Sequence, residues 1–209
     1  MKSLITAALL ASLACATGAQ ATNLSFTGNF NYDNDVQRFT FTLGNDSNVT
    51  LRTWSYAGGI NAQGDTIARG GFDPILTLFD ASGIRIDQQD DGGCSLVDPD
   101  TMSGACYDIH YTNMLSAGTY TATIQQWDNY ANWSLDAGFT YDGAQYQNFR
   151  DGFVDARNDK RDGHWAFDLL KVDTASADAP STNVPEPASL ALLGIGAVGL
   201  LRRKRARSS

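Results

Sequence analysis

The chain has 209 residues, which is enough for one ordinary domain with short segments at its two ends. It contains 15 Lys and Arg residues against 23 Asp and Glu residues, and six of the cations are Lys2 or lie within residues 202–207. The part between these ends therefore has a net charge of −14, from nine cations and 23 acidic residues. Such a surface repels nucleic acid phosphates and anionic lipids, which excludes nucleic acid as a partner.

The first 21 residues have the three parts of a bacterial signal peptide. Lys2 supplies the positive start, residues 4–14 are apolar, and Ala19-Gln20-Ala21 is a small-x-small cleavage site. The apolar run is too short to span a bilayer, and a buried N-terminal helix is the alternative interpretation. We expect the mature chain to begin at Thr22, with Cys15 removed in the leader.

Residues 22–172 alternate short apolar runs with turn residues, as the strands of an all-β domain do. Phe39, Phe41 and Leu43, for example, alternate with threonines, and clusters such as 31–35, 44–48 and 90–93 separate the runs. Period-two runs at this spacing are typical of an antiparallel β-sandwich or barrel. We predict an all-β domain with the architecture of an antiparallel β-sandwich. We also expect a short helix over residues 149–156 and a last strand over residues 165–172.

Two cysteines remain after removal of the leader, Cys94 and Cys106. An even number in an exported chain favours a disulfide, which would stabilise a loop of this size by about 3 kcal/mol. A metal site is the alternative. Such a site would lack further thiols, because no other cysteine remains, and it would lack a nearby pair of histidines, because His110 and His164 are the only ones.

Short motifs between residues 30 and 126 follow one another in a known order. Asp33 and Asp35 precede a strand, DPILTLFDASG covers residues 73–83, DDGG covers 90–93, and AGTY covers 117–120. In this order they resemble the bacterial pre-peptidase C-terminal domain. The resemblance implies a jelly-roll-like β-sandwich that is not catalytic and that in some members binds Ca²⁺ or matrix polymers. No catalytic domain accompanies it here, and residues 127–172 are an extension to the pattern.

The sequence suggests one cofactor, Ca²⁺, and one type of organic ligand, a glycan. Carboxylates in turns that a sandwich gathers at one end suit Ca²⁺, and the candidates are Asp35, Asp73, Asp90 and Asp91. The same residues also suit plain turns. Trp127 and Trp133 offer flat faces to sugar rings, unless they pack in the core. No Gly-x-Ser-x-Gly or other catalytic motif accompanies the histidines, so we expect no enzyme; a secreted hydrolase is the weakest alternative.

After residue 172 the chain changes character. Residues 173–183 are small and polar, which is typical of a linker. Val184-Pro185-Glu186-Pro187 follows, and then an apolar run of 14 residues, 188–201, that ends at Arg202-Arg203. As a C-terminal hydrophobic helix this run would be about 21 Å long against about 30 Å of hydrocarbon, with the basic end in the cytoplasm. An ordinary single-pass anchor is the alternative.

The segment 184–207 closely resembles the PEP-CTERM sorting signal. The resemblance implies recognition by an exosortase, cleavage near Pro185-Glu186-Pro187, and passage of an inner-membrane-anchored intermediate to the cell surface or extracellular matrix of a Gram-negative bacterium. The same segment is sometimes catalogued as an ice-binding-protein C-terminal region, a label that describes only the tail. We therefore predict an exported structural or adhesive protein of an exopolysaccharide matrix or biofilm. The alternative is a calcium- or carbohydrate-binding module.

Overall fold

The computed structural model describes residues 21–143 and 147–178, which form two antiparallel sheets and no helix. The first sheet has the order β1 (Thr22–Asn29), β12 (His164–Val172), β3 (Ser47–Thr53) and β8 (His110–Leu115). The second has the order β13 (Thr174–Ala177), β2 (Val36–Leu43), β9 (Gly118–Gln126), β6 (Pro74–Phe79) and β7 (Arg85–Gln89). Two short hairpins add β4 (Gly59–Ile60) with β5 (Thr66–Ile67), and β10 (Phe153–Val154) with β11 (Lys160–Arg161).

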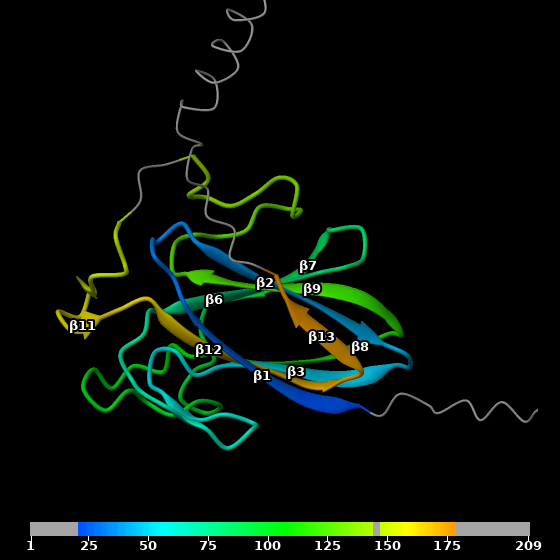
Figure 1. Ribbon diagram of the computed structural model, residues 1–209, viewed down its shortest axis with the longest axis horizontal. Helices are drawn as coiled ribbons and strands as arrows, with labels where there is room; N and C mark the ends of the chain where they lie inside the picture. The colour runs from blue at the N-terminus through cyan, green and yellow to red at the C-terminus, as the bar shows by residue number, and fades with distance from the viewer. Residues whose placement is uncertain (1–20, 144–146, 179–209) are drawn as a thin grey trace, which may run out of the picture.

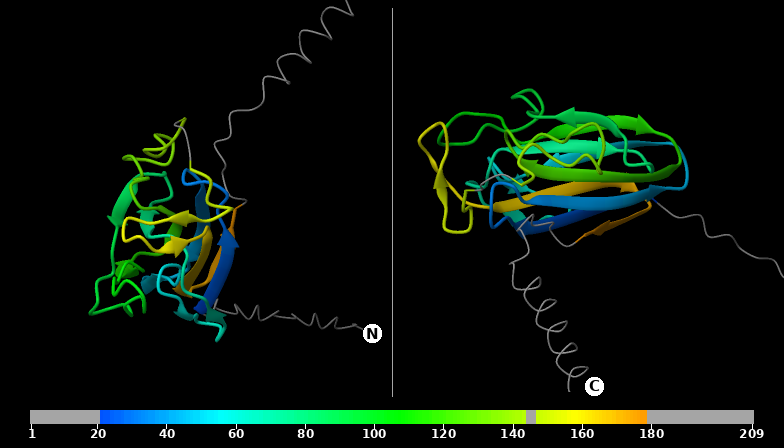
Figure 2. Two further views of the ribbon diagram at one scale, coloured as in Figure 1. Left: turned by 90° about the vertical axis from the view of Figure 1, so that its left-hand side faces the viewer. Right: turned by 90° about the horizontal axis from the view of Figure 1, so that it is seen from above.

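The two sheets lie face to face and share one core (Figures 1 and 2). In β2 the alternation places Phe39, Phe41 and Leu43 inside, while the threonines between them are only partly buried. Phe39 contacts Phe167 of the opposite sheet at a ring distance of 4.6 Å and meets Trp165 edge-on at 5.7 Å. Burying one such side chain stabilises the fold by roughly 1.5–3 kcal/mol, so these contacts between the sheets fix how they stack.

Strand β6 is buried at all six positions because it is covered on both faces. One face packs in the shared core, and residues 127–143 lie against the other side of the sheet. There Ala131 and Phe139 pack on Val36 and Phe79 in a second, smaller cluster. The extension beyond residue 126 is therefore part of the fold.

The structure confirms an all-β antiparallel fold and corrects two expectations. Residues 149–156 form no helix: Gly152 has a φ of 83°, which an α-helix does not allow, and the spacing of Phe149 and Phe153 serves ring stacking at 4.1 Å instead. Part of the expected linker is also ordered, since Thr174–Ala177 pair with β2 as β13. The jelly-roll description stays a prediction. Residues 1–20 of the expected leader (1–21) and the expected C-terminal helix lie outside the described residues.

Candidate functional site

One end of the two sheets carries a pocket of about 380 Å³. Strands of both sheets begin or end there, because antiparallel pairing brings every second connection to the same end. The β10–β11 hairpin lies at this end, at the left of Figure 1. The wall takes acids, amides and aromatic rings from these loops, among them Asp33, Tyr56, Asp73, Asp91, Tyr107, Gln126, Trp127, Tyr141 and Gln147.

Asp73 is placed by the segment that enters β6. Two residues earlier, Gly71 passes so close to the neighbouring chain that a Cβ there would lie 2.3 Å from the carbonyl oxygen of His164. On the other side, the amide of Trp127 donates to the carbonyl oxygen of Asp73 at 2.8 Å. The main chains at Asp73 and Trp127 are thus held next to each other, and both residues line the pocket.

The carboxyl group of Asp73 is in an unfavourable environment. Its Oδ1 is buried and has no hydrogen-bond partner among the described residues. Burial raises the pKa of Asp73 to about 9, and the negative charges of Asp91 and Asp90 contribute to the increase. Burial likewise raises the pKa of Asp91 and of Asp33 in the same wall. Strongly shifted carboxyl groups in a cleft are typical of functional sites.

The four predicted calcium ligands do not form one group. Asp73 and Asp91 line the pocket, whereas Asp90 is not among its lining residues and its Oδ2 accepts a hydrogen bond from the Tyr130 hydroxyl at 3.0 Å. Asp35 instead accepts the amides of Asn31 and Tyr32 at 2.6 and 3.2 Å, which makes it a turn residue. Within residues 21–143 and 147–178, no three His, Cys, Asp or Glu side chains are arranged to hold a metal ion. Calcium binding stays a prediction.

The two predicted glycan residues have different surroundings. Trp127 lines the pocket and is 49% exposed, whereas Trp133 is 67% exposed and lies outside the pocket wall. Tyr141 and Gln147, which the sequence analysis did not single out, complete the wall from the extension. Only their position in a segment rich in aromatic and amide side chains could have indicated them.

Arg161 lines the pocket, and its guanidinium is already paired with carboxylates of the protein. Its guanidinium is buried and donates to Asp155 at 2.9 Å, to the carbonyl oxygen of Tyr56 at 2.9 Å and to Asp100 at 3.1 Å. Arg69 also binds Asp100. Although burial acts in the opposite direction, the hydrogen bonds from Arg69 and Ser103 hold the pKa of Asp100 well below its ordinary value. This network ties the β10–β11 hairpin to the body of the domain.

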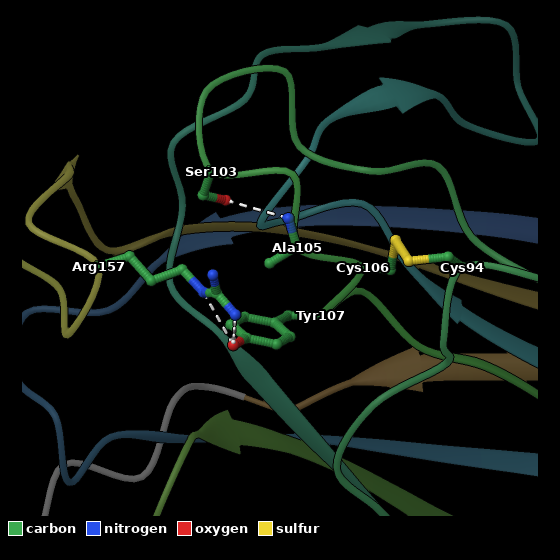
Figure 3. The surroundings of a disulfide bond; sticks show 6 residues. All are labelled: Cys94, Ser103, Ala105, Cys106, Tyr107 and Arg157. Carbon is green, nitrogen blue, oxygen red and sulfur yellow. Dashed lines mark hydrogen bonds between the residues drawn. A yellow bond between two sulfur atoms is a disulfide. The ribbon is translucent and has the colours of Figure 1, made fainter.

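The predicted disulfide between Cys94 and Cys106 is present, and it supports the pocket wall. Cys106 directly precedes Tyr107, so the bond anchors the segment that carries this ring (Figure 3). The Tyr107 hydroxyl accepts hydrogen bonds from Nε and Nη2 of Arg157 at 2.9 and 2.7 Å. Arg157 is exposed and reaches across from the β10–β11 hairpin, so the disulfide loop and the hairpin meet at the pocket rim.

The two histidines have different surroundings. Nδ1 of His164 is engaged by the carboxylate of Asp162, and Nε2 lies 3.0 Å from the carbonyl oxygen of Ala68. Both ring nitrogens therefore have partners other than a serine hydroxyl. His110 lies half-buried in β8. That the protein is not an enzyme stays a prediction.

Comparison with known families identifies the tail. The PEP-CTERM protein-sorting motif matches residues 183–206, the segment predicted to be the sorting signal. No curated protein matches the chain. In the part of the chain that the structure describes, no helix is long and apolar enough to cross a membrane. The motif implies that the protein is exported, passes through a membrane-anchored intermediate and is processed by an exosortase.

Proposed function

We propose that this protein is a non-enzymatic, adhesive component of the cell surface or extracellular matrix, and that its pocket binds a matrix glycan. The observation that carries the proposal is the composition of the pocket wall. A half-exposed tryptophan, Trp127, stands beside carboxyl and amide groups in a cavity of about 380 Å³, which is within the usual range for small-ligand sites.

This composition suits a sugar for a physical reason. A pyranose ring has an apolar face of C–H groups, which packs on an aromatic ring, and a rim of hydroxyls, which need hydrogen-bond partners. Trp127 and Tyr141 supply aromatic surface at the pocket, and Gln126 and Asp91 supply polar groups. Ligand sites commonly combine a mainly apolar wall with a few placed polar groups.

The sorting motif supports the location in which such binding would act. An exported protein that is processed by an exosortase reaches the outside of the inner membrane, where polysaccharide is available as a ligand. The strongly acidic mature chain does not suit anionic partners, because like charges repel. A neutral or cationic polymer is therefore the ligand that charge favours.

The test is retention of the exported protein on immobilised exopolysaccharide from the same cells. We expect Trp127→Ala to weaken retention about tenfold, which corresponds to about 1.4 kcal/mol of lost contact. Trp133→Ala is the matched control, because Trp133 is exposed but outside the pocket. Equal retention of the wild type and Trp127→Ala would contradict the proposal. Release of reducing sugar ends during the assay would show a hydrolase instead of an adhesive protein.

A further inference from the structure

We infer that the pocket selects glycans that carry a protonated amino group, such as a de-N-acetylated hexosamine polymer, over neutral glycans. The inference rests on the proposed glycan site and names its ligand class. It follows from an imbalance of charge: the carboxyl groups of the pocket wall outnumber the cations that are free to compensate them.

The acids of the wall differ in how well they are already satisfied. Asp155 is paired with Arg161, and Asp33 accepts the amide of Gln147 at 2.8 Å. Among the described residues no ion pair joins Asp73 or Asp91 to a cation, although the charge of Arg157 acts to lower the pKa of Asp91. Asp73 also keeps a buried oxygen without a partner among these residues. These two acids therefore have acceptor capacity left for a ligand.

The surroundings of Asp73 add negative charge and almost no positive charge. It faces Asp90 and Asp91 from the end of β7 and Asp108 from the segment before β8. The cation that acts on Asp73 is Arg161 of β11, which already serves Asp100 and Asp155. Arg157 is at the rim and donates to the Tyr107 hydroxyl. A bound cation would allow Asp73 to ionise beside these acids, whereas a neutral hydroxyl would not.

The aromatic groups fit the same ligand. An ammonium group donates three hydrogen bonds and accepts none, which matches carboxyl oxygens. Cations are also attracted to the faces of aromatic rings, and Trp127 lines the same pocket as Asp73, with the two backbones joined by a hydrogen bond. An amino sugar can therefore place its ring on Trp127 and its ammonium group at Asp73 and Asp91.

Binding of a cation has a signature that binding of a neutral sugar lacks. At pH 6 the free carboxyl of Asp73 is protonated, because its pKa is raised to about 9. An ammonium group in contact favours the ionised carboxylate, so binding should release part of a proton, up to one per site. A neutral sugar gives no such release.

Calorimetry of the exported protein at pH 6, with EDTA, tests the inference with three β-1,4-linked tetramers, of glucosamine, of N-acetylglucosamine and of glucose. We expect the glucosamine tetramer to bind at least tenfold more tightly than the other two. Titrations in two buffers of different ionisation enthalpy should show proton release for that ligand alone. Asp73→Asn should abolish the proton release and weaken the glucosamine tetramer about tenfold, with neutral tetramers changed less than twofold. Asp136→Asn, which changes an exposed acid outside the pocket, is the control.

The outcomes separate this inference from the proposed function. Equal or tighter binding of a neutral tetramer would overturn the selectivity and leave the glycan site standing. Binding that appears only when millimolar Ca²⁺ replaces EDTA would overturn it in favour of a metal-mediated contact. If none of the three tetramers binds while retention on the native polysaccharide still depends on Trp127, the inference is also overturned. If no tetramer binds and retention on the native polysaccharide does not depend on Trp127, the proposed function is refuted as well.

Discussion

Replacing Asp73 by Asn should make the folded protein more stable at neutral and alkaline pH. The substitution keeps the size of the side chain and removes a carboxyl group that has one buried oxygen and lies near other acids. Because the pKa of Asp73 is raised above its value in the unfolded chain, the folded state binds more protons than the unfolded state. The wild type therefore loses stability as the pH rises from about 4 towards about 9, and the variant is spared this loss.

The size of the effect follows from the pKa values. An ordinary Asp has a pKa of about 3.9, and each pKa unit corresponds to about 1.36 kcal/mol, so the full cost at pH 7 would be about 4 kcal/mol. Asp73 is partly exposed, and solvent screening reduces the cost, so we expect about 2 kcal/mol. For a domain of this size that corresponds to an increase in Tm of about 4–8 °C.

Thermal melts from pH 5 to pH 8, with the disulfide intact, measure this difference. The gain of Asp73→Asn over the wild type should be below about 1 kcal/mol at pH 5 and should grow with pH. Asp136→Asn removes one acidic charge at an exposed position and serves as the control for net charge. A variant that is less stable than the wild type at pH 8, or a gain that does not depend on pH, would refute the reasoning.

Two further changes test the parts that hold the pocket wall, by urea unfolding. Replacing Cys94 and Cys106 together by Ala should lower the free energy of unfolding by about 3 kcal/mol, because the unfolded chain gains freedom; an unchanged midpoint would contradict this. Arg161→Met should cost about 3 kcal/mol or more, since the carboxylates it pairs lose a fully buried cation. The matched control is Arg157→Met, which removes an exposed guanidinium, and equal losses in the two variants would show that the buried network contributes little.

Local patterns predicted the strands well, because alternation is a property of neighbouring residues. The alternating run around Phe39 correctly predicted β2, and the even number of cysteines correctly predicted the disulfide. The helix expected at 149–156 was wrong because an apolar spacing of four residues also serves two rings that stack in a loop. The strand β13 was missed because small polar residues suit an edge strand, which needs only backbone hydrogen bonds, as well as a linker.

The site was predicted in part for the same reason. The sequence placed Asp73 and Asp91 in turns at one end of the sheets, and both line the pocket. It could not separate them from Asp35, because an acid that caps its own turn has the same local sequence as an acid that faces a cavity. The pairing of Arg161 with Asp100 joins residues 61 positions apart, and no local pattern reports such a contact.

Strand β13 has a consequence for proteolysis at the surface. It occupies the edge of β2, whose backbone groups would otherwise be open to pairing with another chain. It ends at Ala177, before the matched sorting motif begins at residue 183, so a cut within the motif leaves this strand on the sheet. A protease that cut before Thr174 would do more than detach the protein, because it would expose a strand edge that can recruit a second copy.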